Sequence, residues 1–197
     1  SFAYNGPVAW IEDSRGMIGA ALMILGFDPN TSDPGEITQA RDFLIENGSN
    51  VVAIAADDGQ ALLAAGEVDI VVEYSGDIFM VMDENPGKFN YVIPEEAAVF
   101  WLDNLVIPVG APNADLANVF IDYILDPQVG ADISNYTAFA TPNLRAIELG
   151  LIDEDLINNP GIYPSEEARQ NLFIVEDNPD GEQYINDAWN ELKIFLG

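Results

Sequence analysis

Short apolar segments alternate with helix signals through the first hundred residues, and this alternation constrains the fold more than any other feature of the sequence. The segments 7–12, 51–55 and 68–74 have the length and composition of buried strands. A helix signal follows each of them, as in a sheet of parallel strands that are joined by crossover helices. We therefore expect an α/β fold in which helices flank a largely parallel sheet.

Capping residues mark the ends of the helices in this region. Asp13 or Ser14 can cap a helix that runs to Gly26, where glycine suits the left-handed end of a helix. The stretch 33–36, Asp-Pro-Gly-Glu, resembles a capping box with proline at the first helical position. Two further helices are predicted, over 57–65 and from about 77 to 85.

Beyond about residue 109 the pattern becomes mainly helical. Before this change the sequence predicts further strands over 91–93, 99–102 and 105–109, and Pro108 places the last of them at an edge or an end of a sheet. The later helices are predicted over 114–125, 127–136, 144–149, 165–172 and 182–196. No run of about 18 apolar residues occurs, so no membrane-spanning segment is expected.

Cysteine and histidine are both absent from the 197 residues. Their absence removes thiolate chemistry, the commonest general base and the commonest metal ligand. It excludes Ser-His-Asp and Cys-His nucleophiles and argues against a zinc site. We expect no catalytic residue, metal or cofactor. A hydrolase that uses two carboxylates as general acid and base is the enzymatic alternative.

Acidic residues outnumber basic residues by 34 to 6, which gives a formal net charge of −28. A field of this sign repels nucleic acid and anionic lipid, and it concentrates cations at the surface. Solubility, or adaptation to a salty medium, explains the surplus as well as a cationic ligand does. An acidic interaction or sensor domain that binds no small molecule is therefore another alternative.

An aromatic and an acidic residue occur together near the end of one predicted strand. Trp101 and Asp103 stand two residues apart in a strand-like run, and in a strand both side chains would point to the same side. The carboxylate would then accept charge-assisted hydrogen bonds from an alkylammonium group, and the indole ring would add a cation–π contact. A core tryptophan beside a turn-forming aspartate explains the same pattern without a ligand.

Three other residues are candidates because of their places in the predicted fold. Asp13 stands at a strand-to-helix junction, where open α/β sheets place their ligands, and Tyr74 ends a predicted strand. Phe139 precedes the turn-like segment 140–143, Ala-Thr-Pro-Asn. Each also has a plain structural explanation: a helix cap, a core aromatic and a helix stop, respectively.

Taken in order, these segments resemble the spermidine/putrescine-binding proteins of ABC importers, which have the type II periplasmic-binding fold. The similarity covers essentially the whole chain. Its more specific motifs are Phe100-Trp101-Leu102-Asp103-Asn104-Leu105 and the spacing from Gly66 to Tyr74-Ser75-Gly76-Asp77. Weaker similarities lie at 11–15, 25–26, 140–143 and Tyr163-Pro164.

The resemblance implies a non-enzymatic extracytoplasmic or periplasmic protein that captures putrescine or spermidine for the permease subunits of an ABC importer. In that family acidic residues bind the amino groups and aromatic side chains flank the methylene chain. Another small cationic or amino solute is the nearest alternative. By position, Asp13 and Asp103 match acidic ligands and Trp101 an aromatic wall, while Tyr74 and Phe139 stand where the family often has Trp and Tyr.

The same resemblance implies a domain division. Residues 1–103 would form the core of the second lobe, 104–147 would cross back to the first lobe, and 148–197 would return as C-terminal helices. Family members extend further on the N-terminal side, and the start of this chain lacks the pattern of a signal peptide. Apolar faces between 105 and 143 would therefore lack their usual partner, and self-association is expected.

Gly16 stands where some members carry a second Glu.

Overall fold

The computed structural model describes residues 4–197, which divide into two compact units. The first unit contains the chain up to Tyr74 together with Val92–Trp101 and Glu166–Gly197. The second unit contains Ser75–Tyr91 and Leu102–Ser165. In this division, 75–91 and 148–165 group with the segment that follows residue 101. The assignment of the units to lobes stays a prediction.

A three-stranded parallel sheet forms the centre of the first unit. Its strand order is β2 (Val51–Ala55), β1 (Val8–Ile11) and β3 (Ile70–Val71). β1 pairs with both neighbours and is buried along its whole length, which accounts for its continuous apolar sequence. The parallel sheet and its flanking helices confirm the α/β fold expected from the alternating sequence pattern.

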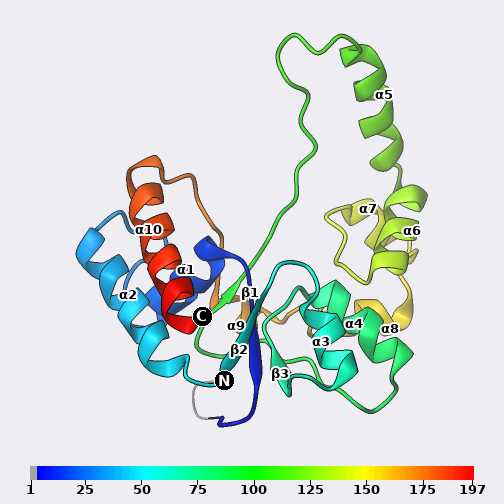
Figure 1. Cartoon of the computed structure of the whole chain (residues 1–197). Coiled ribbons are helices and arrows are strands. Elements are labelled where there is room, and N and C mark those ends of the chain that lie inside the picture. The colour runs from blue at the N-terminus through cyan, green and yellow to red at the C-terminus, as the bar shows by residue number, and fades with distance from the viewer. Residues whose placement is uncertain (1–3) are drawn as a thin grey trace. The chain divides into compact units, whose positions relative to one another are not determined.

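Three helices cover one side of this sheet. α1 (Ser14–Ile24), α2 (Pro34–Asn47) and α10 (Pro179–Leu196) lie together there, whereas α3 (Gly59–Ala65) lies on the other side (Figure 1). The predicted cap at Asp33 is confirmed, because its side chain accepts hydrogen bonds from the N–H groups of Gly35 and Glu36. Gly26, predicted at the end of the helix that follows Asp13, is left-handed with φ 84°. The largest fully buried side chains between sheet and helices are Trp10, Ile18, Leu22, Ile37, Leu44, Ile185 and Leu192.

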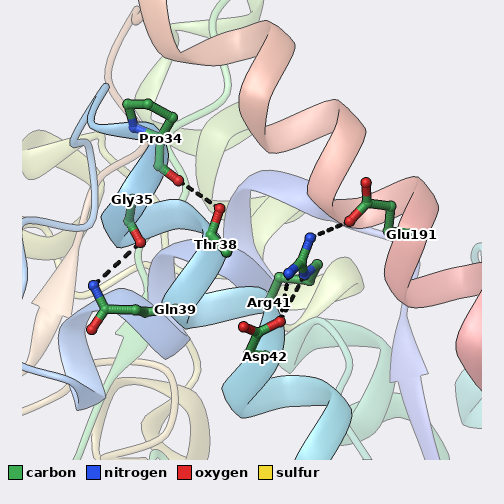
Figure 2. Close-up of polar contacts among 7 residues, drawn as sticks. All are labelled: Pro34, Gly35, Thr38, Gln39, Arg41, Asp42 and Glu191. Atoms are coloured by element: carbon green, nitrogen blue, oxygen red, sulfur yellow. Dashed lines mark hydrogen bonds and ion pairs between the residues drawn. The ribbon is translucent and has the colours of Figure 1, made fainter.

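A polar cluster joins α2 to α10 on the outside of this layer. Arg41 on α2 forms ion pairs with Asp42, at 2.6 Å, and with Glu191 on α10 (Figure 2). In the same view the side chains of Thr38 and Gln39 donate hydrogen bonds to backbone oxygens one turn earlier in α2. Of these contacts, the Arg41–Glu191 ion pair links the C-terminal helix to α2, and the others lie within α2.

A second, two-stranded sheet lies in the first unit. β4 (Ala98–Val99) pairs in parallel with β5 (Leu172–Phe173), which follows the short α9 (Glu166–Arg169). The helix predicted over 165–172 is therefore wrong beyond Arg169. Pairing with β4, more than 70 residues earlier in the chain, explains why local helix propensity does not decide this segment.

The second unit is helical. It contains α4 (Ser75–Glu84), α5 (Ala114–Ile124), α6 (Pro127–Thr137), α7 (Leu144–Glu148) and α8 (Glu154–Ile157). Ala131, Ala146 and Ile152 form its small buried core, and the rings of Phe79 and Tyr91 pack with centroids 4.8 Å apart. The acidic residues 153–155 stand at the start of α8, and Asp153 exchanges hydrogen bonds with Asn135.

Several predicted strands are shortened or missing. The strands expected over 68–74 and 99–102 shrink to the two-residue β3 and β4. The segments 91–93 and 105–109 form no strand. Apolar residues form a strand only where another strand completes the hydrogen bonds, and Leu105 and Val106 instead lie 57% and 80% exposed.

Within residues 4–197, no helix combines the length and the apolar character that a membrane span requires.

Candidate functional site

Two of the predicted site residues lie at the same edge of the first unit's sheet. β1 and β3 are parallel neighbours, so their carboxyl ends meet at one edge. Asp13 follows the end of β1 by two residues, and Tyr74 follows the end of β3 by three. Tyr74 is half-buried and packs against the hydrophobic core of the unit. Both residues therefore occupy the edge at which open α/β sheets bind ligands.

Asp13 caps α1 and is partly buried. Its Oδ1 accepts a hydrogen bond of 3.0 Å from the N–H of Gly16, which confirms the predicted cap. Burial raises the pKa of the Asp13 carboxyl above its ordinary value, against the opposing effects of the backbone N–H groups of Gly16 and Arg15 and of the Arg15 charge. The carboxylate is thus only partly solvated, and pairing with a cation is worth more there than on an open surface.

Trp101 lies close in the chain to a residue that borders the α1 cap. A Cβ added at Gly16 would lie 3.2 Å from Cγ2 of Val99, so β4 runs beside the N-terminal turn of α1. The N–H of Phe100 donates to the oxygen of Phe173 at 2.8 Å, which fixes the backbone up to the residue before Trp101. Trp101 is 43% exposed, which leaves the residue accessible to a ligand.

The strand geometry predicted for Trp101 and Asp103 is wrong. β4 ends at Val99, and residues 100–107 have no regular secondary structure. The argument that alternate residues of a strand share one face therefore does not apply to this pair. Asp103 is exposed and belongs to the second unit, whereas Trp101 belongs to the first.

Phe139 lies in the second unit between α6 and α7, where its ring rests on the first turn of α4. A Cβ added at Gly76 would overlap this ring. The Phe139 oxygen accepts a hydrogen bond of 2.5 Å from Ser134, and Ala138 ends α6 in the left-handed conformation with φ 58°. These contacts hold the ring in place while 40% of the residue stays exposed.

Sequence reasoning missed two features around Asp13. Arg15 donates a hydrogen bond of 2.6 Å to the backbone oxygen of Glu176, far away in the chain, and no local signal announces this contact. Gly16 is buried beside the Asp13 carboxylate. Its place three residues after a capping aspartate was visible in the sequence, but its closeness to Val99 was not.

No metal site lies at these residues, which all belong to the described part of the chain. Within residues 4–197, no group of three or more Asp and Glu side chains is arranged to hold a metal ion. A small pocket of about 110 Å³ lies instead between α2 and α10, where its basic residue, Arg41, already has two acidic partners (Figure 2). This pocket carries none of the predicted ligand residues.

Comparison with known proteins identifies the class to which the chain belongs. The model of the bacterial extracellular solute-binding protein family matches residues 2–163. The chain is 30% identical over 190 residues to spermidine/putrescine-binding periplasmic protein 1 of Haemophilus influenzae, an alignment that covers 96% of this chain and 52% of the relative. It is 31% identical over 168 residues to the spermidine/putrescine-binding periplasmic protein of Escherichia coli, which covers 85% of this chain and 47% of the relative.

A solved structure agrees with these relatives. The spermidine/putrescine ABC transporter substrate-binding protein of Streptococcus pneumoniae superposes with a TM-score of 0.82 at 29% identity, over 100% of this chain and 60% of that one. The chain therefore belongs to the bacterial extracellular solute-binding protein family. Its fold is that of part of a type II periplasmic-binding protein. It spans about half the length of the curated relatives it matches.

Membership of this family bears on the enzymatic alternative. Solute-binding proteins of this kind are non-catalytic, so the carboxylate-based hydrolase considered from the sequence is set aside.

Proposed function

We propose that the protein captures polyamines, putrescine or spermidine, as the solute-binding component of an ABC importer, in the periplasm or another extracytoplasmic compartment. The observation that carries this proposal is the placement of Asp13 and Tyr74 at one sheet edge, with β4 beside the Asp13 cap and the exposed Trp101 two residues after the end of β4. The names of the relatives, which describe spermidine- and putrescine-binding periplasmic proteins, support it.

The residues have separate roles in this proposal. Asp13 and Asp103 bind ammonium groups through charge-assisted hydrogen bonds. Trp101, Tyr74 and Phe139 cover the methylene chain and add cation–π contacts to its charged ends. All five side chains are at least partly accessible, as a binding role requires. The permease subunits of the importer are the proposed protein partners.

The energies of such contacts are sufficient for capture. An ammonium group and a carboxylate about 4 Å apart gain roughly 4 kcal/mol of Coulomb energy at an effective dielectric constant near 20, before desolvation is subtracted. Two such pairs, together with about 0.8 kcal/mol for each buried methylene, support micromolar affinity, which corresponds to about 8 kcal/mol. No covalent step is needed, in agreement with a chain that has neither His nor Cys.

A calorimetric titration tests the proposal. Putrescine, spermidine and spermine are titrated into the protein expressed from its whole gene, and into its Asp103→Asn and Asp155→Asn variants. Asp155 is an exposed carboxylate on α8 and serves as the matched control. We expect Asp103→Asn to weaken binding more than tenfold, a loss of at least about 1.4 kcal/mol, and Asp155→Asn to leave it unchanged.

Two outcomes would contradict the proposal. Equal losses in both variants would mean that only the bulk negative field attracts the cations. Binding of a small amino compound in preference to all three polyamines would favour the alternative solute class.

A further inference from the structure

We propose that Gly16 is a positioning residue for the Asp13 carboxylate: because position 16 has no side chain, the carboxylate lies down against the first turn of α1. The inference deepens the proposed function, since it concerns how a candidate ammonium ligand is held. It rests on the geometry of one helix end.

The space around Gly16 is already filled. A Cβ built there would overlap Oδ2 of Asp13, and it would lie 2.9 Å from the Asp13 Cγ and 3.2 Å from Cγ2 of Val99. Contacts below 3.0 Å are not found for real Cβ atoms, so something would have to move. Val99 is fixed in β4 by its pairing with Phe173, so the carboxylate is the group that would yield.

Backbone conformation does not explain the glycine. Positive φ angles occur at other glycines, such as Gly26 and Gly66, but Gly16 is not among them. Glycine inside a helix costs roughly 1 kcal/mol relative to alanine. The buried glycine at the third position of α1 therefore makes the helix less stable than alanine would, although its φ angle does not require glycine. What the glycine provides is room for the Asp13 carboxylate.

The two oxygens of the Asp13 carboxylate have different surroundings. Oδ1 accepts the hydrogen bond from the Gly16 N–H, and Oδ2 lies in the space that a side chain at position 16 would take. The charged group nearest to Asp13 on its own helix is Arg15, whose guanidinium is engaged with the Glu176 oxygen. A side chain at position 16 would push the carboxylate outward and change both its solvation and the direction in which it meets a ligand.

The same cap occurs elsewhere in the first unit and provides a matched control. Gly181 is the third residue of α10, its N–H donates to Oδ1 of the capping Asn178 at 3.0 Å, and a Cβ there would overlap Nδ2 of Asn178. Asn178 is not a candidate ligand residue. Gly181→Ala thus disturbs a helix cap of the same geometry without touching Asp13.

The test compares Gly16→Ala with Gly181→Ala by two measurements. The first is the titration of the Asp13 carboxyl carbon, followed by NMR without ligand. The second is the affinity for spermidine. For Gly16→Ala we expect the Asp13 pKa to fall toward its ordinary value, because the displaced carboxylate is better solvated, and the affinity to fall at least fivefold. Gly181→Ala should change the stability of the fold and neither of these quantities.

The two measurements separate this inference from the proposed function. An unchanged Asp13 titration in Gly16→Ala, or an equal change in Gly181→Ala, would overturn the positioning role. A shifted titration with unaltered spermidine affinity would support the positioning role and would contradict the assignment of Asp13 as a polyamine ligand.

Discussion

Asp13 combines the roles of helix cap and candidate ligand, and its two roles have opposite demands. The cap needs only an oxygen that accepts from the Gly16 N–H, which an asparagine supplies equally well. Binding of a cation needs the negative charge, and burial of that charge is unfavourable, as the raised pKa of Asp13 records. The charged Asp13 therefore makes folding less favourable than a neutral capping residue would.

Substitutions at Asp13 should separate the two roles through stability. Asp13→Ala loses the cap and should cost about 1 kcal/mol of unfolding free energy relative to Asp13→Asn. At pH 7, Asp13→Asn should be at least as stable as the native chain, because the amide avoids the burial of a charge. Urea unfolding, followed by the fluorescence of the buried Trp10 and Trp189, measures these differences.

The pH dependence of the same comparison has a definite sign. A carboxyl whose pKa is raised on folding destabilises the native state above the folded pKa, and this cost disappears as the pH falls through the ordinary aspartate value of about 3.9. The native chain and Asp13→Asn should therefore converge in stability on acidification. A gap that widens in favour of Asp13→Asn at low pH would contradict the raised pKa.

At the scale of elements, glycines in the first turns of two helices support candidate site residues. Gly16 in α1 leaves room for the Asp13 carboxylate, and Gly76 in α4 leaves room for the Phe139 ring. Gly76 thereby joins the start of α4 to the segment between α6 and α7, within the second unit. The position of Phe139 thus depends on packing between two helical segments as well as on the turn that follows it.

Gly76→Ala should disturb this junction. The added methyl group would overlap the Phe139 ring, and overpacking of this kind costs about 1–3 kcal/mol. A double-mutant cycle with Phe139→Ala should give a coupling energy of at least about 0.5 kcal/mol, because the smaller side chain removes the overlap. Unfolding of the second unit, followed by hydrogen exchange, provides the measurement.

Gly130→Ala is the control for this experiment. Gly130 lies inside α6, and a Cβ there would have its nearest contact at 3.3 Å from Asn143. The Asn143 side chain would have to shift by only a few tenths of an ångström, so Gly130→Ala should destabilise the unit less than Gly76→Ala. Equal destabilisation by both substitutions would refute the specific packing of Phe139 on Gly76.

For the whole molecule, exposed apolar residues favour association with a second chain, whereas the strong negative charge disfavours it. α5 has no buried residue, and its exposed Leu116, Val119, Phe120 and Tyr123 follow the spacing of one helix face. Apolar faces of this extent are seldom left in water. The net charge of −28 opposes the approach of a second chain, and salt weakens that repulsion.

The chain of 197 residues should consequently self-associate through α5, and more strongly as the ionic strength rises. Light scattering or sedimentation over a range of salt concentrations measures the association. Phe120→Asp should abolish it, whereas Ile194→Asp, which changes an exposed apolar residue of α10 in the first unit, should not. A stable monomer at every salt concentration would contradict this prediction.

The sequence by itself determined the features that depend on neighbours in the chain. The caps at Asp13 and Asp33, the left-handed glycine at 26 and the buried strand β1 were all predicted, because each arises from interactions within a few residues. The edge shared by Asp13 and Tyr74 also followed from the sequence, since parallel strands joined by crossover helices bring their carboxyl ends together.

Only the tertiary structure decided the features that need a distant partner. β4 ends at Val99 because β5 offers two residues for pairing, and this leaves Trp101 and Asp103 outside any strand. The lack of space for a side chain at position 16 depends partly on Val99, and the position of the Phe139 ring depends on the absence of a side chain at Gly76. Strand pairing and close packing depend on segments far apart in the chain, so local propensity does not predict them.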